Sequence, residues 1–221
     1  MTTKKLGPAR PRNAASLVIF RKYRNQYQVL MGRRGSKAKF KPGVYVFPGG
    51  IVERDDYVVQ PKKKLKTQYT RMMAVANSHR KANGLAMCAV REAFEEVGLT
   101  LGEKGQLNAV ENNTWQHFKQ LGLSPNLKLL DYLGRAITPP IQPIRFHARF
   151  FSINFAQMHG NILGDGELED IRWVRLDQSE KLEMRLVQKM IMETLAKRLS
   201  GLSAPAQKLF FSWGRINIKR S

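Results

Sequence analysis

The sequence predicts a mixed α/β (α+β) protein in which a mixed β-sheet lies between helices. Three observations favour this class. Short runs of β-branched and aromatic residues, bounded by turn residues, precede and follow a stretch whose apolar residues recur at helical spacing. Of the 221 residues, 43% are apolar, which is enough for one sizeable core. The sequence also shows no internal repeat and no Pro-, Gly- or Ser-rich linker that would divide it into domains.

Three strands and a helix are expected in the first half of the chain. Residues 1–12 are basic and predict a flexible tail. The segments NAASLVIF (13–20) and QYQVLMGRR (26–34) predict two strands, and VYVFPGG (44–50) predicts a short strand that ends in a Gly-Gly turn. Apolar residues at helical spacing predict a helix from about Leu85 to Val97, and the glycine that follows it is a natural C-terminal stop.

The second half predicts a short helix, three strands and a longer helix. The short helix lies in NNTWQHFKQLGL (112–123), with Asn or Thr as its N-cap. The strands are expected at 129–138, 144–155 and 168–176. Apolar residues at helical spacing then predict a helix that starts near Ser179 and is stopped by Gly201. Residues 201–221, which are aromatic and basic, are expected to form a C-terminal tail.

The charge of the chain is its unusual bulk property. The net charge is +21 and the pI is about 10.5, and residues 1–50 contain twelve Lys or Arg and no Asp or Glu. Such a balance favours encounters with polyanions: nucleic acid, an acidic membrane surface or phosphorylated small molecules. The alternative is a solvated basic surface with no specific partner. Charge therefore supports a class of partner without identifying the chemistry.

Membrane and secretory classes are not favoured. No apolar run approaches the roughly 20 residues of a membrane helix, and no strongly amphipathic basic helix stands out. The single cysteine, Cys88, cannot form an internal disulfide, which agrees with a reducing, cytoplasmic location. We interpret Cys88 as a small buried side chain on a helix, with a reactive thiol as the alternative.

A cluster of acidic residues in REAFEEVGL (91–99) carries the strongest chemical signal. On a helix, Glu92, Glu95 and Glu96 lie on one face, because residues three and four positions apart are neighbours. Three carboxylates repel one another, and Mg²⁺ prefers such oxygen clusters together with substrate phosphates. Arg91 can brace one carboxylate through a bidentate pair. The alternative is a solvated acidic helix face.

The Gly-Gly pair upstream strengthens the metal interpretation. Gly49 and Gly50 allow backbone N–H and carbonyl groups to approach a ligand closely. We therefore expect the turn and the helix to form two walls of one site. A divalent ion held there would clamp a pyrophosphate and lower the pKa of an attacking water.

With Gly50 as its opening glycine, the segment resembles the Nudix box, Gly-x5-Glu-x7-Arg-Glu-U-x-Glu-Glu-x-Gly-U, where U is an aliphatic or bulky apolar residue. The second half of the box is matched at every fixed acidic, basic and glycine position. The resemblance implies the Nudix fold and a hydrolase that cleaves a nucleoside diphosphate linked to another moiety. It also implies catalytic roles for Arg91, Glu92, Glu95 and Glu96.

The same resemblance implies a divalent metal cofactor, Mg²⁺, with Mn²⁺ as the alternative. The implied ligands are the side chains of Glu92, Glu95 and Glu96 and the carbonyl of Gly50 or Gly49. Glu92 is implied either as a metal ligand or as the base that activates water.

The first half of the box departs from the pattern. Counted back from Arg91, the place of the first glutamate is held by Asn83, but counted forward from Gly50 it falls on Asp56. Either Asp56 or Glu53 would take over its role.

The departure suggests a box interrupted by the polar, basic segment 57–83. In this it resembles the coenzyme A diphosphatase-like subfamily, which carries such an insertion. The resemblance predicts a single Nudix domain over residues 13–200, with the insertion at 57–83.

The stretch LMGRRGSKAKFKPGVYVFPGG (30–50) is similar to the pattern that precedes the box in coenzyme A-cleaving members. Arg34 matches the first arginine of that pattern, and Lys39 replaces the second. The resemblance implies substrate binding by Arg34, Lys39, Gly49 and Gly50. It implies coenzyme A or acyl-coenzyme A as the substrate, giving adenosine 3′,5′-bisphosphate and (acyl-)phosphopantetheine.

Other readings stay open. A Nudix hydrolase could instead act on ADP-ribose, a dinucleotide such as NADH, or RNA 5′ ends, and the basic N-terminal half keeps a nucleic-acid partner in view. No stripe of aromatic residues interleaves with the basic ones, which stacking on single strands would favour. A non-catalytic nucleotide-binding Nudix domain is a further class, although the glutamates are intact. The sequence also leaves a homodimer open.

Overall fold

The computed structural model describes residues 8–36, 42–108, 111–164, 166–212 and 215–221. The α-helices are α1 (His79–Val97), α2 (Asn113–Gln120) and α3 (Leu186–Leu199). The strands are β1 (Arg12–Tyr23), β2 (Gln26–Arg34), β3 (Tyr45–Val46), β4 (Gly49–Ile51), β5 (Glu103–Lys104), β6 (Leu123–Ser124), β7 (Asp131–Ile137), β8 (Phe146–Asn154), β9 (Leu168–Arg175), β10 (Gln207–Ser212) and β11 (Arg215–Arg220). Short 3₁₀ helices are η1 (Asp55–Tyr57), η2 (Thr67–Tyr69), η3 (Leu127–Leu129), η4 (Phe155–Gln157) and η5 (Leu176–Lys181).

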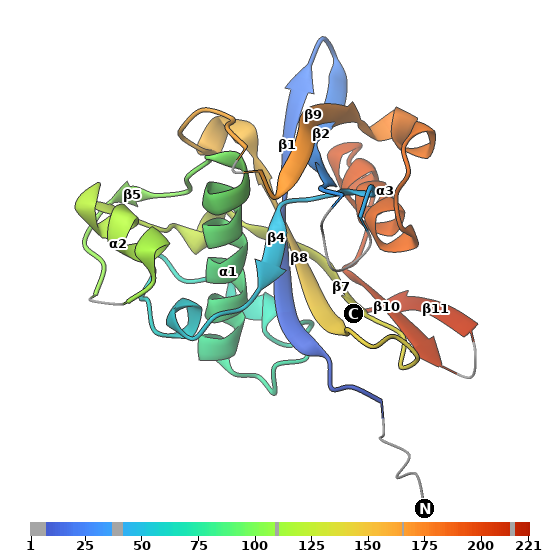
Figure 1. Cartoon of the computed structure of the whole chain (residues 1–221), viewed down its shortest axis with the longest axis horizontal. Helices are drawn as coiled ribbons and strands as arrows, with labels where there is room; N and C mark the ends of the chain where they lie inside the picture. The colour runs from blue at the N-terminus through green and yellow to red at the C-terminus, as the bar shows by residue number, and fades with distance from the viewer. Residues whose placement is uncertain (1–7, 37–41, 109–110, 165, 213–214) are drawn as a thin grey trace, which may run out of the picture.

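A mixed sheet of nine strands organises the described part of the chain. Its order is β11-β10-β7-β8-β1-β2-β3, with β4 paired to β1 and β9 paired to β2. β1 runs parallel to β8 and β10 runs parallel to β7, whereas β1 and β2 are antiparallel. α1 and α2 lie on one side of the sheet and α3 lies on the other (Figure 1). The predicted mixed sheet between helices is therefore confirmed.

Each face of the sheet has its own apolar core, because alternate side chains of a strand point to opposite faces. On the central strand β1, Leu17 and Ile19 join the core that contains α1, whereas Val18 joins the core that contains α3. Strand β1 is thus buried on both sides, which explains its continuous apolar run. Within the described ranges, no helix has the length and apolar composition that crossing a membrane requires.

The helix that carries the glutamates starts earlier than the sequence predicts. α1 begins at His79 rather than near Leu85. The hydroxyl of Ser78 accepts a hydrogen bond from the Lys81 N–H at 3.3 Å and caps the helix. The helix ends where predicted, at Val97, and Gly98, with a φ of +71°, forms a left-handed C-terminal cap.

The segment between η1 and α1 packs against the helix. Its buried side chains in the α1-side core are Val59, Leu65, Tyr69, Met73 and Val75. Gly84 permits the approach, because a Cβ there would lie 2.2 Å from a ring carbon of Tyr57. Residues 79–83 belong to α1, so only residues 57–78 of the expected 57–83 insertion lie outside the helix.

The Gly-Gly pair forms a strand, and the prediction of a turn at this position is wrong. Gly49–Ile51 is β4, which runs antiparallel to β1 with Gly49 opposite Ser16 and Gly50 opposite Ala15. A Cβ at Gly49 would lie 2.5 Å from the carbonyl oxygen of Ala15, so the close strand contact requires glycine. Strand β4 places both glycines beside α1, as Figure 1 shows.

The last helix begins later than predicted. It starts at Leu186 as α3 rather than near Ser179. The preceding residues Leu176–Lys181 form 3₁₀ turns, interrupted at Gln178, whose φ of −118° is not helical. An extended Arg185 then leads into α3.

Residues 201–221 extend the sheet, so the prediction of a tail after a domain ending at residue 200 is wrong. β10 pairs parallel with β7, and β11 folds back antiparallel on β10. We call β10 and β11 the C-terminal hairpin. Gly134 lets the hairpin approach β7, because a Cβ there would lie 2.3 Å from the carbonyl oxygen of Gln207.

Candidate active site

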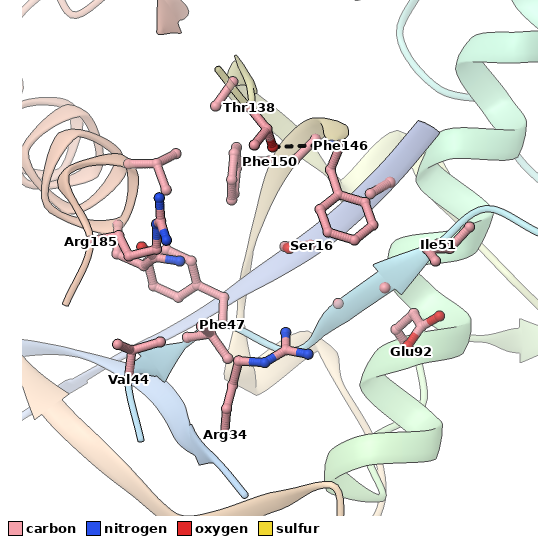
Figure 2. Close-up of a pocket in the computed structure, with 18 of the residues that line it drawn as sticks. Ser16, Arg34, Val44, Phe47, Ile51, Glu92, Thr138, Phe146, Phe150 and Arg185 are labelled. Carbon is pink, nitrogen blue, oxygen red and sulfur yellow. Dashed lines mark hydrogen bonds between the residues drawn. The ribbon is translucent and has the colours of Figure 1, made fainter. Parts of the chain in front are cut away.

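A cavity of about 510 Å³ lies between α1 and β4 on one side and α3 on the other. Four glutamates line its α1 side: Glu53, Glu92, Glu95 and Glu96. Much of the rest is lined by apolar side chains from β3, β7, β8, α3 and the C-terminal hairpin, among them Val46, Ile137, Phe146, Phe150, Leu186, Leu209 and Ile216, and polar side chains such as Glu167 and Arg185 also line it. Glu92 and Arg185 stand on opposite sides of the cavity, and Arg34 reaches between them (Figure 2). The cavity therefore has an acidic end and an apolar end.

The glutamates of α1 meet the Gly-Gly strand at the acidic end. Glu96, which is 6% exposed, accepts the N–H of Gly49 at 2.7 Å. A Cβ at Gly50 would lie 2.5 Å from Oε1 of Glu92, so the carboxylate lies directly against the bare backbone. The structure thus brings Gly49, Gly50, Glu92 and Glu96 together.

Arg91 holds the acidic end together from beneath. Its side chain is only 2% exposed. Its Nη1 lies 2.8 Å from Glu92 Oε1 and donates to Glu95 Oε2 at 2.7 Å. Its Nη2 donates to the carbonyl of Ile51 at 2.9 Å, which ties α1 to β4. One guanidinium therefore fixes two of the three helix glutamates relative to the strand.

Asp56 is the acid that meets Arg91 from outside the helix. It is 1% exposed, and its two oxygens accept from Nε and Nη2 of Arg91 at 3.0 and 3.1 Å. It also accepts from the indole N–H of Trp115 at 3.0 Å and from the N–H of Glu53 at 2.9 Å. The carboxylate of Glu53 is 53% exposed and lies 3.9 Å from Nη1. Between the two acids that the sequence leaves open, the buried bidentate partner is Asp56.

The electrostatics of the site follow from this packing. Burial raises the pKa of Glu92 to about 7, and the negative charge of Glu95 adds to the rise although Arg91 opposes it. Burial works against the charge of Arg91, but Asp56 and Glu92 outweigh that effect and raise its pKa. Arg91 is thus surrounded by more carboxylates than one guanidinium neutralises. A further positive charge would therefore stabilise the acidic end.

The glutamate side chains bind other protein groups and do not point at one common position. Arg91 and Thr114 hold Glu95, and Gly49 holds Glu96. In the described ranges, no three His, Cys, Asp or Glu side chains converge as the ligands of one ion do. The carbonyl oxygen of Gly50 accepts a hydrogen bond from the thiol of Cys88, with an S···O distance of 3.6 Å. The donor set along the cavity wall is nonetheless all oxygen, which suits hard divalent ions such as Mg²⁺.

Cys88 is a buried residue in the wall behind this site. It is 0% exposed, and burial raises the pKa of its thiol well above the ordinary value. A protonated, inaccessible thiol is a poor nucleophile. The interpretation of Cys88 as a packing residue on a helix agrees with this environment.

Of the two basic residues expected to bind substrate, the structure describes only Arg34. Arg34, at the end of β2, lines the cavity (Figure 2). Its Nε is shielded from solvent and has no hydrogen-bond partner within the described residues. Lys39 lies outside the described residues.

Several lining residues are not found by the sequence argument. Arg185 and Gln188 come from the start of α3, and Phe210 and Ile216 come from the C-terminal hairpin. Trp115, considered in the sequence only as packing or as a base-stacking residue, is fully buried and braces Asp56. No motif marks these residues, because their roles depend on contacts between distant segments.

Comparisons with known proteins agree on one class. No protein-family model matches the chain. It is 28% identical over 174 residues to "Putative nudix hydrolase 7" of Caenorhabditis elegans, covering 74% of this chain and 51% of the relative. The chain therefore spans about half the length of that curated relative.

Solved structures give the same result. The chain is similar to the crystal structure of a NUDIX hydrolase from Alicyclobacillus acidocaldarius, with 26% identity, a TM-score of 0.65, and coverage of 88% of this chain and 98% of the other. The NUDIX domain of Shewanella oneidensis NrtR, solved with ADP ribose, shares the fold at 12% identity with a TM-score of 0.50, covering 86% of this chain and 90% of that one. The chain is thus similar to Nudix hydrolases in sequence and in fold.

Proposed function

We propose that the chain hydrolyses the diphosphate bond of a nucleoside diphosphate-linked substrate, with coenzyme A or acyl-coenzyme A as the favoured substrate. The observation that carries this proposal is the acidic end of the cavity. There, three glutamates from one face of α1 border the same space as the bare backbone of β4. A cavity with convergent polar groups and a perturbed carboxyl pKa is the arrangement expected of an active site.

The oxygen donors at the acidic end have the chemistry that suits a divalent metal. Arg91 is the cation that contacts Glu92, Glu95 and Asp56, and it is outnumbered by them. Mg²⁺, or Mn²⁺, would be held by Glu92, Glu95 and Glu96, with the carbonyl of Gly50 as a further oxygen. Such an ion supplies charge neutralisation for the phosphoryl oxygens and a lower pKa for water.

The chain's own residues have distinct parts in the reaction. Glu92, whose pKa burial raises, is either a ligand of the metal or the base that accepts the proton of the attacking water. The water oxygen then bonds to one phosphorus, the bridging P–O bond breaks, and the second phosphate leaves. Arg91 positions Glu92 and Glu95 through its guanidinium.

Arg34 is the residue we assign to substrate phosphate. It lines the cavity, and its shielded Nε has no partner in the described residues, so a phosphate oxygen would satisfy that donor. Lys39 is proposed for the same task from the sequence pattern alone. The net charge of +21 favours the approach of a substrate with several phosphates, such as coenzyme A.

A hydrolysis panel tests the function. The purified chain is incubated with Mg²⁺ and either coenzyme A, acyl-coenzyme A, ADP-ribose, NADH or 5′-triphosphorylated RNA, and products are identified by mass. We expect adenosine 3′,5′-bisphosphate and (acyl-)phosphopantetheine to form fastest. Faster cleavage of ADP-ribose, NADH or RNA would replace the substrate assignment, and no cleavage of any compound would favour a non-catalytic nucleotide-binding domain.

Two substitutions test the residue roles. Glu95→Gln should lower kcat by orders of magnitude with the fold intact, because it removes one carboxylate charge without changing shape. Glu193→Gln is the matched control, since Glu193 is 64% exposed on α3 in a surface pair with Lys197. Arg34→Ala should raise KM for the substrate more than it lowers kcat. Unchanged kinetics in Glu95→Gln would refute the assigned site.

A further inference from the structure

The apolar end of the cavity contains one polar group that the protein does not satisfy. Gln188, in the first turn of α3, is 7% exposed and lines the cavity. Its Oε1 is shielded from solvent and has no hydrogen-bond partner within the described residues. A buried acceptor without a partner destabilises the folded chain, a penalty that leucine at the same position would avoid.

Several apolar side chains line the cavity together with Gln188. Phe47 and Phe150 lie in the core that α3 covers and also line the cavity. Leu209 and Ile216 of the C-terminal hairpin complete the wall. These side chains cannot donate a hydrogen bond, and none of the described residues donates one to Oε1 of Gln188, so a donor on a molecule in the cavity would satisfy it.

Gln188 lies on the side of the cavity where the non-phosphate end of a substrate would extend. It lies three residues after Arg185, which Figure 2 places across the cavity from Glu92. A substrate whose diphosphate lies against the glutamates therefore extends its other end toward α3 and the C-terminal hairpin.

We propose that the apolar end binds the non-phosphate part of the substrate and that Gln188 is the specificity-determining residue, accepting a hydrogen bond from an N–H on that part. This inference rests on the proposed function and narrows its substrate class to diphosphates whose apolar end carries an amide or amino N–H. Two sources have this chemistry: the exocyclic amino group of an adenine, and an amide in a pantetheine arm.

Two matched substrate pairs separate the sources. One pair is ADP-ribose and its analogue with hydrogen in place of the 6-amino group. The other is coenzyme A and an analogue in which the amide nearest the thiol is an ester. In one of the pairs, the wild-type chain should favour the N–H compound by about tenfold in kcat/KM. Gln188→Leu should abolish that preference by raising KM for the N–H compound while changing kcat little.

Matched controls separate recognition from folding. Gln188→Leu removes a buried unsatisfied group, so its melting temperature should equal or exceed that of the wild type. Gln157→Leu, an exposed glutamine of η4 outside the cavity lining, should keep the preference. Ile216→Ser, at a side chain that is 55% exposed, should raise KM for both members of the affected pair, and Ile141→Ser, 79% exposed and outside the lining, should not.

The outcomes distinguish the two proposals. Cleavage without any preference in either pair, or a preference that survives Gln188→Leu, overturns the role of Gln188 and leaves the proposed function standing. If none of the four compounds is cleaved and the panel above also shows no cleavage of NADH or RNA, the proposed function fails. Kd values of the same compounds, measured by calorimetry, then test the role of Gln188. Loss of the N–H should weaken binding to the wild-type chain and should not weaken binding to Gln188→Leu.

Discussion

Replacing Asp56 by alanine is the sharpest test of how the site is held. The substitution removes the bidentate partner of Arg91, whose side chain is 2% exposed. It also leaves the indole N–H of Trp115 and the N–H of Glu53 without their acceptor. The structure therefore predicts both a loss of stability and a loss of order among the glutamates that Arg91 positions.

The magnitude follows from the remaining contacts. Breaking a buried ion pair costs about 3–5 kcal/mol when one partner is removed. Arg91 keeps Glu92 and Glu95, which favours the lower end, and the orphaned indole of Trp115 adds about 1 kcal/mol. We expect a total near 4 kcal/mol, or a fall in Tm of roughly 8–16 °C for a chain of this size.

The assay is chemical denaturation with thermal melting, run beside Glu53→Ala. Glu53 is 53% exposed and 3.9 Å from Arg91, so its removal should cost less than about 1 kcal/mol. Asp56→Ala should also lower kcat, since the positions of Glu92 and Glu95 depend on Arg91. Equal losses in the two variants, or a cost below about 1 kcal/mol for Asp56→Ala, would show that Asp56 does not anchor Arg91.

Three further predictions follow from the same contacts. With metal removed by a chelator, folding raises the pKa of Glu92 from 4.5 to about 7, so the contribution of Glu92 to stability is full below pH 4.5 and is lost, by up to about 3 kcal/mol, as pH rises through 7; the difference in stability between the wild type and Glu92→Gln should change by this amount in denaturation curves, and a difference that does not vary with pH would assign the effect elsewhere. Gly50→Ala brings a Cβ to within 2.5 Å of Glu92, so kcat should drop while the circular dichroism spectrum is retained; normal turnover would show that the carboxylate moves freely. Gly84→Ala forces a methyl group against the ring of Tyr57, at 2.2 Å, and should cost about 1–3 kcal/mol by thermal melting; an unchanged Tm would mean that the 57–78 segment is not packed on α1.

The acidic wall was predictable because its geometry is local. Glu92, Glu95 and Glu96 share a face through helical spacing alone, and α1 extends through all three. Strands β2, β7, β8 and β9 also lie where alternation and turn residues predict them. The Gly-Gly pair was located correctly beside the glutamates, but its conformation was not, because pairing with β1 turns it into a strand.

Local signals failed where a distant contact overrides them. Gly84 weakens the helical pattern, yet it lies inside α1 because Tyr57 requires a residue without a side chain there. The C-terminal hairpin gives no clear strand pattern, and it forms because Gly134 opens an edge of β7 to it.

By itself the sequence determined the chemical content of this protein: a helix face of carboxylates, an arginine beside them, a pair of glycines and a large positive charge. These depend on spacing and composition, which folding does not change. Only the tertiary structure decided that Asp56 is the partner of Arg91 and that α3 and the C-terminal hairpin build the apolar end around Gln188. These contacts depend on which distant segments of the chain come close together, and the packing of the two cores around the sheet determines this.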